Sequence, residues 1–512
     1  MFSKVISAAT FGIDAYTVDV ETHYEKQLPS FTIVGLPDNA VKESRERVNA
    51  AIKNSGYKFP IKKITVNLAP ADMRKEGSSF DLPIAVGIIA ATGEISSYYL
   101  GNSMLLGELS LDGTLRKIKG ALPIAVEAKK SGVKHLLLPK ESAEEAAIVD
   151  GIEVYGFNTL AEVVRFLNGE SNIKKTIVNR DELFNHINNY LFDFADVKGQ
   201  ENVKRALEIA AVGGHNVLMI GPPGSGKTML AKRLPSILPP LTFEEALETT
   251  KIYSVAGILD DSHSLITERQ FRSPHHTVSD AALIGGGSYP RPGEVSFAHH
   301  GVLFLDEFPE FKKNVLEVLR QPMEDRRVTI SRSRMSVEFP ANFMLAAAMN
   351  PCPCGYLTDP DHECTCSINS IQRYMGKISG PLVDRIDIQI EVPAIKYKEL
   401  SSETRGESSE TIRDRVIKAR ELQTERFKNL PNIHKNADME THEIREYCKL
   451  DEAGKELLKM AITKLGLSAR AYDRILKVSR SIADVENSEN IQSRHVGEAI
   501  QYRSLDRELW KR

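Results

Sequence analysis

A glycine-rich segment near the middle of the chain constrains the fold more than any other feature. Its eight residues are Gly221, Pro222, Pro223, Gly224, Ser225, Gly226, Lys227 and Thr228. They match a phosphate-binding loop, in which glycines let backbone N–H groups approach phosphates, the lysine neutralises the terminal phosphates and the threonine hydroxyl binds Mg²⁺. An apolar strand pattern at residues 216–220 precedes the loop and a helical pattern follows it, which is the required order. We therefore expect an α/β core that binds ATP and Mg²⁺.

Two further apolar strand patterns end in polar residues suited to ATP hydrolysis. Residues 301–305 are followed by Asp306, which we expect to hold the magnesium ion, and by Glu307, which we expect to polarise the attacking water. Residues 343–348 lead to Asn350, whose amide would position that water. A solvated strand end and a turn-forming asparagine are the structural alternatives. Together with the loop, the pattern favours hydrolysis over binding alone.

The length and composition of the chain indicate several globular domains. With 512 residues, 42% of them hydrophobic and 26% charged, the chain is too long for one ordinary core and has an ordinary globular composition. The fold class we expect is multidomain α/β. Its parts are an α+β domain at residues 1–170, a linker at 171–195, the phosphate-loop core with a parallel sheet at 196–395 and a helical lid at 396–512.

The periodicity of apolar residues places individual elements in these domains. We expect strands at residues 31–34, 64–68 and 135–138 and helices at residues 39–55, 200–212, 457–464, 471–484 and 494–502. The apolar run at residues 82–91 is too short to span a bilayer, and an acidic residue, Asp14, stands before any run typical of a signal peptide. We therefore expect a cytoplasmic protein without a membrane partner.

Four of the five cysteines are concentrated in fifteen residues. Cys352 and Cys354 form one pair, and Cys364 and Cys366 form another. This clustering is unlike a disulfide framework and resembles the four thiolates of a structural zinc site, with four metal-free thiols as the alternative. His362 is an alternative fourth ligand. The fifth cysteine is most simply a core residue.

A basic segment between Glu307 and Asn350 reads as two short strands joined by a turn. It carries four arginines: Arg326, Arg327, Arg332 and Arg334. Because the net charge is only −3, contacts with nucleic acid would depend on such local clusters. Arginines on a hairpin can bind phosphates without reading base sequence, although a solvated hairpin or a subunit contact is the alternative.

Several motifs together resemble one known family, the YifB/ComM proteins of the magnesium-chelatase-like branch of AAA+ ATPases. The resemblance runs over nearly the whole chain and includes Ser3-Lys-Val-Ile-Ser7, Phe31-Thr-Ile-Val-Gly-Leu-Pro-Asp38, the phosphate-binding loop, Phe271-Arg-Ser-Pro-His-His276 and Leu303-Phe-Leu-Asp-Glu-Phe308. It implies an ATP hydrolase that acts as a ring, most simply a hexamer. It further implies branch migration or helicase activity on branched or single-stranded DNA during natural transformation.

The same resemblance gives roles to three further residues. Asn350 corresponds to sensor 1, Arg385 to the arginine finger that acts on the neighbouring subunit's ATP, and Arg470 to sensor 2. The residue type alone leaves the roles of both arginines open. Two other functions remain in view. One is a chelatase motor subunit that drives Mg²⁺ insertion into protoporphyrin, and the other is an ATP-gated assembly platform, for which Glu307 would be superfluous.

The first domain resembles the proteolytic domain of Lon protease. The segments that carry this likeness are residues 75–79, 81–85, 107–109 and 136–140. Ser79 falls at the position of the nucleophilic serine, but Leu122 stands where the lysine base is expected. Lys117 or Lys119 would replace that base only in a shifted alignment. We therefore expect a scaffold or DNA-contacting domain without peptidase activity.

Overall fold

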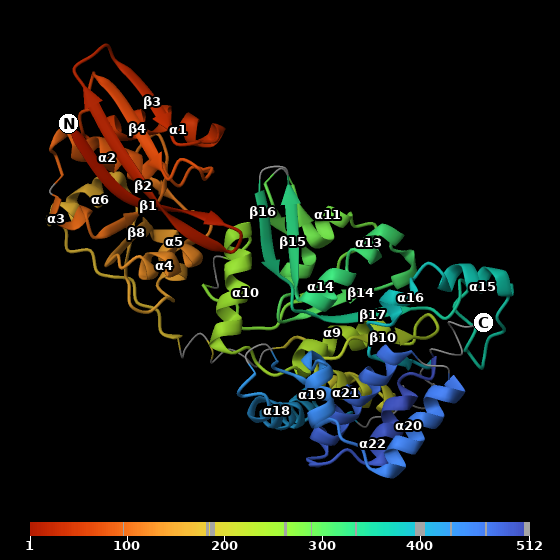
Figure 1. Cartoon of the computed structure of the whole chain (residues 1–512). Coiled ribbons are helices and arrows are strands. Elements are labelled where there is room, and N and C mark those ends of the chain that lie inside the picture. Colours follow the sequence, from red (N-terminus) through yellow and green to blue (C-terminus); the bar gives the residue numbers. More distant parts are fainter. Residues whose placement is uncertain are drawn as a thin grey trace. The chain divides into compact units, whose positions relative to one another are not determined.

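A computed structural model describes most of the chain (Figure 1). The described residues are 1–95, 97–180, 184, 190–260, 264–287, 289–332, 335–394, 405–430, 433–465 and 468–505. The chain forms two compact units. The first contains Met1–His186 together with Phe243–Thr267, and the second contains Ile187–Thr242 together with Glu268–Arg512.

A seven-stranded mixed sheet forms the centre of the first unit. Its strand order is β3-β4-β2-β1-β5-β8-β9. The pairs β1–β2 and β2–β4 are antiparallel, whereas the other neighbours run parallel. The bounds are β1 Phe2–Phe11, β2 Asp14–Glu25, β3 Ser30–Val34, β4 Lys63–Ala69, β5 Ser103–Leu105, β8 His135–Pro139 and β9 Glu153–Phe157; a small pair, β6 Glu108–Leu109 and β7 Leu115–Arg116, lies apart. The expected strands at 31–34, 64–68 and 135–138 are confirmed.

Helices of the first unit bury their apolar faces in a core of their own. They are α1 Asn39–Asn54, α2 Asp81–Thr92, α3 Ser97–Leu100, α4 Ala121–Lys130, α5 Lys140–Ala146 and α6 Leu160–Leu167. Helix α1 begins after Asp38, whose carboxylate accepts a hydrogen bond from the Val41 N–H at 2.7 Å. Helix α2 ends at Gly93, which has a left-handed φ of 86°. Nearly all of α2 is buried, consistent with its continuous apolar sequence.

A later helix, α10 (Phe243–Ala256), also belongs to the first unit. It packs on α4, and the carbonyl of Ser254 accepts a hydrogen bond from the Gly120 N–H at 3.2 Å. The Ser254 hydroxyl donates to the buried carboxylate of Glu145, and Lys251 pairs with Asp14 at 3.0 Å. The sequence pattern placed residues 243–267 within the range of the phosphate-loop core. In the structure this segment instead completes the first unit.

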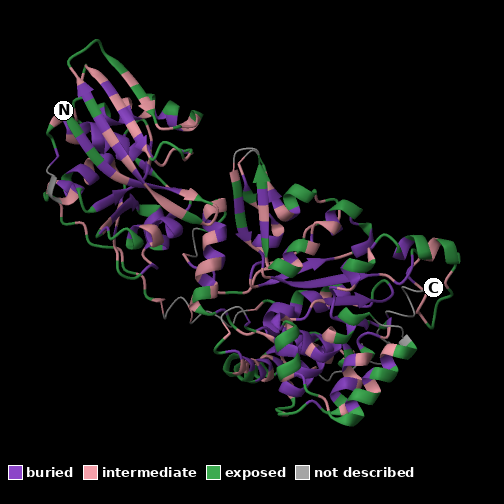
Figure 2. Cartoon of the chain, in the orientation of Figure 1, coloured by how far each residue is buried: buried purple, intermediate pink, exposed green. Residues whose placement is uncertain are grey.

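The second unit is built on a five-stranded parallel sheet. Its order is β11-β14-β17-β10-β18, with bounds β11 Phe271–Arg272, β14 Val302–Leu305, β17 Met344–Met349, β10 Val217–Ile220 and β18 Ile388–Glu391. Every residue of β10, β14 and β17 is buried, as Figure 2 shows, which accounts for their uninterrupted apolar sequences. Because the strands are parallel, the segments that follow them emerge at one edge of the sheet.

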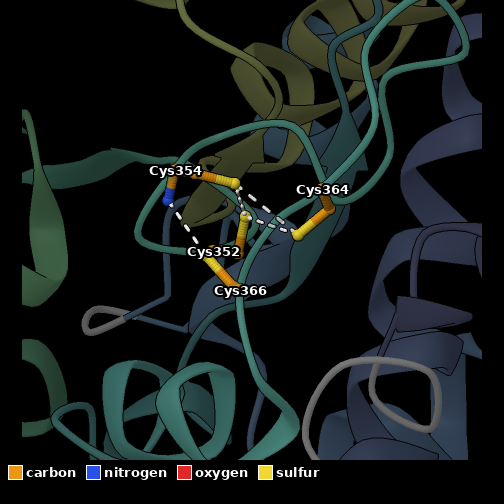
Figure 3. Close-up of side chains that lie close together, drawn as sticks. All are labelled: Cys352, Cys354, Cys364 and Cys366. Carbon is orange, nitrogen blue, oxygen red and sulfur yellow. Dashed lines mark hydrogen bonds between the residues drawn. The ribbon is translucent and has the colours of Figure 1, made fainter.

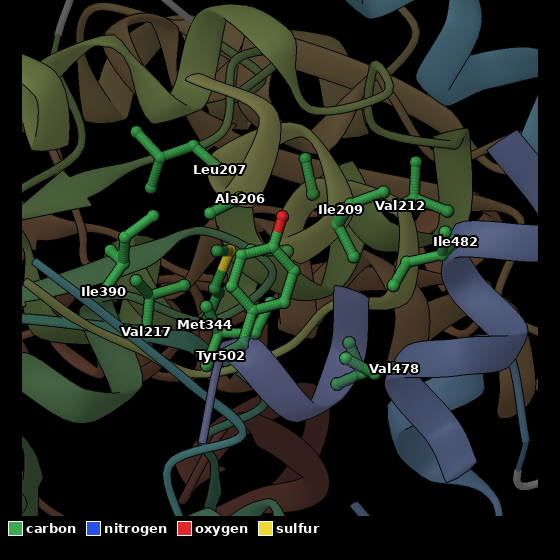
Figure 4. Close-up of a cluster of buried hydrophobic side chains, with 14 of the residues drawn as sticks. Ala206, Leu207, Ile209, Val212, Val217, Met344, Ile390, Val478, Ile482 and Tyr502 are labelled. Carbon is green, nitrogen blue, oxygen red and sulfur yellow. The ribbon is translucent and has the colours of Figure 1, made fainter. Parts of the chain in front are cut away.

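Helices from both ends of the second unit share one hydrophobic core with this sheet (Figure 4). Leu207 of α8 (Glu201–Gly213), Val217 of β10 and Ile482 of α21 (Ala469–Val485) are all fully buried in it. The other helices that contribute to this core are α9 Lys227–Ile237, α18 Ser409–Arg426, α19 Thr441–Tyr447, α20 Glu452–Leu465 and α22 Ser493–Gln501. The expected C-terminal helices are therefore confirmed, while residues 395–404, where the expected helical lid begins, lie outside the described residues.

Short elements complete the second unit. The helices are α11 Asp280–Ile284, α12 Glu294–Phe297, α13 Lys313–Glu317, α14 Arg320–Asp325, α15 Ile368–Met375 and α16 Gly380–Val383. Two antiparallel hairpins accompany them: β12 Gly285–Gly286 with β13 Arg291–Pro292, and β15 Arg327–Arg332 with β16 Met335–Pro340. The latter confirms the hairpin expected from the basic segment.

Candidate ATP-hydrolysis site

The phosphate-binding loop follows β10 and depends on its glycines. A Cβ atom on Gly221 would lie 2.1 Å from the carbonyl oxygen of Val392, so no larger residue fits there. Gly224 and Gly226 have φ angles of 76° and 87°, in the left-handed region that glycine adopts without strain. This conformation leads directly into α9, whose first residue is Lys227.

The Lys227 ammonium is buried within the loop and contacts the end of a second strand. Its Nζ donates to the carbonyl oxygens of Gly221 and Pro222 at 2.7 and 2.8 Å, and to Oδ1 of Asn350 at 3.2 Å. Burial lowers the pKa of Lys227 to about 8, and the charge of Asp306 opposes this shift only partly. The structure therefore brings together Lys227 and Asn350, which are far apart in the sequence.

Thr228 and Asp306 form the oxygen pair expected for a magnesium ion. The Thr228 hydroxyl donates to Oδ2 of Asp306 at 2.6 Å, and Oδ1 of Asp306 accepts the N–H of Glu307 at 2.9 Å. A hydroxyl and a carboxylate are ligands that Mg²⁺ accepts alongside phosphate oxygens. Both ligands are oxygen atoms, and both lie at the sheet edge that carries the phosphate-binding loop. The residues present therefore fit a magnesium ion.

Glu307 has an unusual backbone and a partner that the sequence did not reveal. Its φ is 51°, a left-handed conformation that is uncommon for a residue with a long side chain. Its carboxylate lies 3.2 Å from Nδ1 of His276, and the His276 ring contacts that of His275 in a tilted arrangement, with centroids 4.1 Å apart. His276 follows β11, the neighbour of β14, so both residues emerge at the same sheet edge. The structure therefore places the histidine pair beside the carboxylate that we expect to polarise the water.

A cavity of about 380 Å³ gathers the expected hydrolytic residues. Its lining consists of Lys227, Asp306, Glu307, Glu310, Met349, Asn350, Pro353, Ser370, Arg373, Tyr374 and Lys377. Four of these residues were expected from the sequence. The last four come from α15 and the turn after it, which the sequence pattern did not connect with the site. The cavity thus has a phosphate-binding side and a second, cationic side.

Neither of the two expected arginines lines this cavity. Arg385 is only 6% exposed, donates to the Pro381 carbonyl at 2.6 Å and forms an ion pair with Glu324. Burial lowers its pKa, and the nearby charge of Arg470 contributes to the shift. Arg470 is exposed in the first turn of α21. The two arginines therefore lie near each other and away from the cavity of their own chain.

Gln200 connects the phosphate-binding loop to the neighbouring strand β18. Its Nε2 donates to the carbonyl oxygens of Ser225 and Pro393 at 2.9 and 3.0 Å. A larger cavity of about 840 Å³ opens beside it, with Val203, Ile390 and Tyr502 among the lining residues. The sequence pattern placed Gln200 at the start of a helix and gave it no role. Only its contacts in the structure identify it as part of the site.

The four clustered cysteines converge on a common centre (Figure 3). The Sγ atom of Cys352 lies 3.3 Å from that of Cys354 and 3.7 Å from that of Cys364, and all four sulfurs lie within 4.8 Å of one another. The Tyr356 N–H lowers the pKa of the Cys354 thiol to about 6, which favours the metal-binding thiolate. His362 is outside this group and bonds to Asp359 at 3.2 Å. The four cysteines are therefore compatible with a zinc site.

The basic hairpin presents its arginines unequally. Arg327 pairs across the hairpin with Glu338 at 3.3 Å, and Arg332 donates to the carbonyl of Gly287 at 3.2 Å; both are exposed. Arg326 is half-buried and pairs with the nearly inaccessible carboxylate of Asp438 at 3.0 Å, so its role is structural. Arg334 lies outside the described residues. Two of the four arginines thus remain on an exposed surface.

Ser79 has no base in the described part of the first unit. No hydrogen bond joins its hydroxyl to a described side chain, and Leu122 is fully buried in α4. The nearby Lys75 is also buried, and its ammonium donates to the carbonyls of Pro70 and Met73.

Within the described residues, no helix has the length and apolar character needed to cross a membrane.

Comparisons with known proteins agree with this geometry. Family models match at residues 20–142 (subunit ChlI of Mg-chelatase), 193–400 (magnesium chelatase, subunit ChlI) and 406–503 (the C-terminal part of that subunit). Lon protease 2 of Bacillus subtilis is 32% identical over 159 residues, which are 28% of this chain and 27% of that protein. The mixed fold of the first unit and the parallel-sheet core of the second fit these matches.

Two relatives match along almost the whole chain. Competence protein ComM of Haemophilus influenzae is 45% identical over 509 residues, which cover 99% of this chain and 98% of that protein. The uncharacterized protein YifB of Escherichia coli is 44% identical over the same length, with the same coverage. Membership of such a family implies an ATPase motor that uses ATP and Mg²⁺. With the phosphate-binding loop, Asp306, Glu307 and Asn350 at one sheet edge, the chain belongs to the YifB/ComM family of magnesium-chelatase-like AAA+ ATPases.

Proposed function

We propose that the protein is an ATP-hydrolysing ring, most simply a hexamer, that moves branched or single-stranded DNA and drives branch migration of recombination intermediates. The observation that carries this proposal is the exposed basic hairpin β15–β16, which extends from the same unit as the hydrolysis site (Figure 1). Resemblance to the YifB/ComM family points to the same substrate and to natural transformation. The relative from Haemophilus influenzae is itself named a competence protein.

The hairpin is built as expected for a loop that contacts the phosphate backbone of DNA. One face is anchored by the buried side chains of Val328, Ile330 and Phe339. Arg327 is on the opposite face, whereas Arg332 lies at the end of the anchored face and reaches the Gly287 carbonyl; both are exposed. A Cβ atom on Gly285 would lie 2.7 Å from the Ile330 side chain, so the β12–β13 hairpin packs closely against it. Two neighbouring loops thus form one surface. Its arginines would bind phosphates independently of base sequence.

The hydrolysis site supplies the chemistry of the motor. Lys227 would bind the terminal phosphates, Thr228 and Asp306 would hold Mg²⁺, and Glu307 would take a proton from the attacking water while Asn350 orients that water. The larger cavity beside Gln200 has a mixed lining, in which Val203, Ile390 and Leu505 supply apolar contacts among charged and polar residues, and we assign it to the adenine ring. When bound, Mg²⁺ neutralises charge that develops on the phosphate oxygens.

Arg385 supports assembly of the ring. An arginine that stabilises the transferred phosphate has to reach it, yet Arg385 is outside the cavity that holds Lys227 in its own chain. We propose that it reaches the ATP of the neighbouring subunit, with Arg470 beside it. The four cysteines would hold a zinc ion.

A labelled four-way DNA junction tests the proposed activity. Purified protein with ATP and Mg²⁺ should convert the junction into two-armed products, and Lys227→Ala should not. The double variant Arg327→Ala with Arg332→Ala should retain its ATPase rate without DNA, and the slope of log affinity against log salt should fall by about 2. Failure of DNA to stimulate wild-type ATP hydrolysis would contradict the DNA function.

The chelatase function is the second candidate, and the family models favour it in one respect. They match the chelatase subunit ChlI in all three parts of the chain. The four-cysteine segment departs from the pattern expected of that motor subunit, and the first unit is also similar to Lon protease. Magnesium insertion into protoporphyrin in the presence of chelatase partner subunits, without any DNA stimulation, would establish it instead.

A further inference from the structure

We propose that the four cysteines bind zinc and that this zinc controls nucleotide binding, because the ligand-bearing segment forms one wall of the ATP cavity. The inference rests on the proposed hydrolysis site and is independent of the DNA substrate. It assigns Arg373, held by this segment, as a further phosphate-binding residue.

The sulfur positions fit a tetrahedral ion. A Zn–S bond of about 2.3 Å in tetrahedral geometry places neighbouring sulfurs about 3.8 Å apart. The Sγ atoms of Cys352, Cys354 and Cys364 are separated by 3.3, 3.6 and 3.7 Å, close to that value and far beyond a disulfide bond. Backbone N–H groups also point at sulfur: Gly355 donates to Cys352 at 3.2 Å, and Cys354 donates to Cys366 at 3.4 Å. Such donors hold sulfur ligands in a fixed orientation around a metal ion.

The loop between the cysteine pairs packs directly on the phosphate-binding loop. Gly355 has a left-handed φ of 89°, and a Cβ atom added there would lie 2.6 Å from Cδ of Pro223 and 3.8 Å from Cγ of Asn350. Pro353, between the first two cysteines, lines the ATP cavity itself. A zinc ion at the cysteines would therefore fix this loop against the phosphate-binding loop and against Asn350.

Helix α15 begins immediately after the last cysteine. Ser367 caps it by accepting the Ser370 N–H at 3.3 Å, and within the helix only Tyr374 and Met375 are buried. A helix of eight residues is unstable by itself, and so small an apolar face cannot fix its position alone. We infer that the zinc-bound Cys366 anchors its first turn. The helix in turn holds the cationic side of the cavity.

Two cations stand on that side, and their surroundings differ. The Lys377 ammonium donates hydrogen bonds to both carboxylate oxygens of Glu310, at 3.0 and 3.1 Å. Arg373 is exposed, lines the cavity with Asp306 and Glu307, and has no hydrogen bond or ion pair with any described residue. Its guanidinium is therefore available to a phosphate, for which arginine has the suitable planar set of donors.

The test uses the full-length protein without DNA, so its outcome is separate from that of the junction assay. Elemental analysis should find about one zinc ion per chain and no iron. The double variant Cys364→Ser with Cys366→Ser should lose the zinc and bind a fluorescent ATP analogue at least about tenfold more weakly, with unchanged far-ultraviolet circular dichroism. Cys448→Ala, which removes a buried thiol outside the cluster, is the matched control and should keep both the zinc and the affinity.

A second variant separates the contribution of Arg373 to ATP binding from that of the zinc ion. Arg373→Ala should keep its zinc but raise the KM for ATP about tenfold or more, because a hydrogen bond to a charged phosphate is lost, and Arg373→Lys should restore part of the affinity. A substitution of the neighbouring exposed Gln372 by Ala should change neither quantity. Absence of zinc, iron in its place, or an unchanged affinity after zinc loss would each overturn the proposal.

Discussion

The carboxylate of Glu307 lies 3.2 Å from Nδ1 of His276. This contact joins the expected catalytic base to the segment that follows β11. Glu307 is otherwise largely exposed, with 61% of its side chain accessible. The imidazole is thus the contact that sets the direction of the carboxylate among the described residues.

We expect His276→Ala to raise the ATPase rate in the absence of DNA. A carboxylate held by the imidazole is less free to move to the attacking water, so its release should increase the basal rate several-fold. Steady-state hydrolysis measured with and without DNA checks this, with Glu307→Gln as a control that should lose about 100-fold or more. A lower basal rate in His276→Ala would show that the histidine instead holds Glu307 in its productive position.

Nucleotide binding should take up protons near pH 8. Burial lowers the pKa of Lys227 to about 8 in the free protein, whereas a bound phosphate requires the charged ammonium. The free lysine is protonated below this pH and increasingly neutral above it, so ATP affinity should fall as the pH rises from 7 to 9. Calorimetry at pH 8 in buffers of different ionisation enthalpy should detect an uptake of about half a proton. Lys227→Arg should abolish that uptake, since arginine stays charged.

Arg385→Ala should bind ATP normally and hydrolyse it at least about 1,000-fold more slowly. Mixing this variant with Lys227→Ala should restore part of the hydrolysis rate. In the proposed ring, assemblies of Arg385→Ala and Lys227→Ala chains would contain interfaces at which an intact Lys227 faces an intact Arg385, and these should hydrolyse ATP. Glu324→Gln tests whether the ion pair with Glu324 matters by itself, and we expect its rate to remain near that of the wild type. Mixed assemblies without activity would place Arg385 in a structural role.

Ser79→Ala should leave both ATP hydrolysis and DNA stimulation unchanged. The wild-type protein should not cleave an unfolded protein substrate, because Ser79 has no lysine base within the described first unit. A fluorescent casein assay measures the first property and steady-state ATPase the second. ATP-dependent cleavage that Ser79→Ala abolishes would establish a peptidase.

Much of the fold was predictable because its strands are unusually apolar. The runs before Gly221, Asp306 and Asn350 are buried on both faces, so their patterns revealed three strands, and a parallel sheet necessarily brings the polar residues after them to one edge. The phosphate-binding loop, the two carboxylates and the asparagine could therefore be placed together from sequence alone.

The rest depended on contacts that no local pattern records. Strand β11 has only two residues, so its place beside β14, which brings His276 to Glu307, was invisible. Arg326 looked like its neighbours on the hairpin, yet its partner Asp438 lies more than a hundred residues away. Helix α15 resembled any short surface helix, and only the cavity lining connects it with ATP.

The return of α10 to the first unit bears on how the chain can be divided. The backbone passes between the two units at residues 186 to 187, 242 to 243 and 267 to 268. A fragment that ends at residue 186 would lack α10 and leave the buried Glu145 without the Ser254 hydroxyl. The second unit cannot be isolated as one continuous fragment either, because residues 243–267, which belong to the first unit, interrupt it. Recombination that exchanges the whole first unit between relatives must therefore carry two separate stretches of the gene.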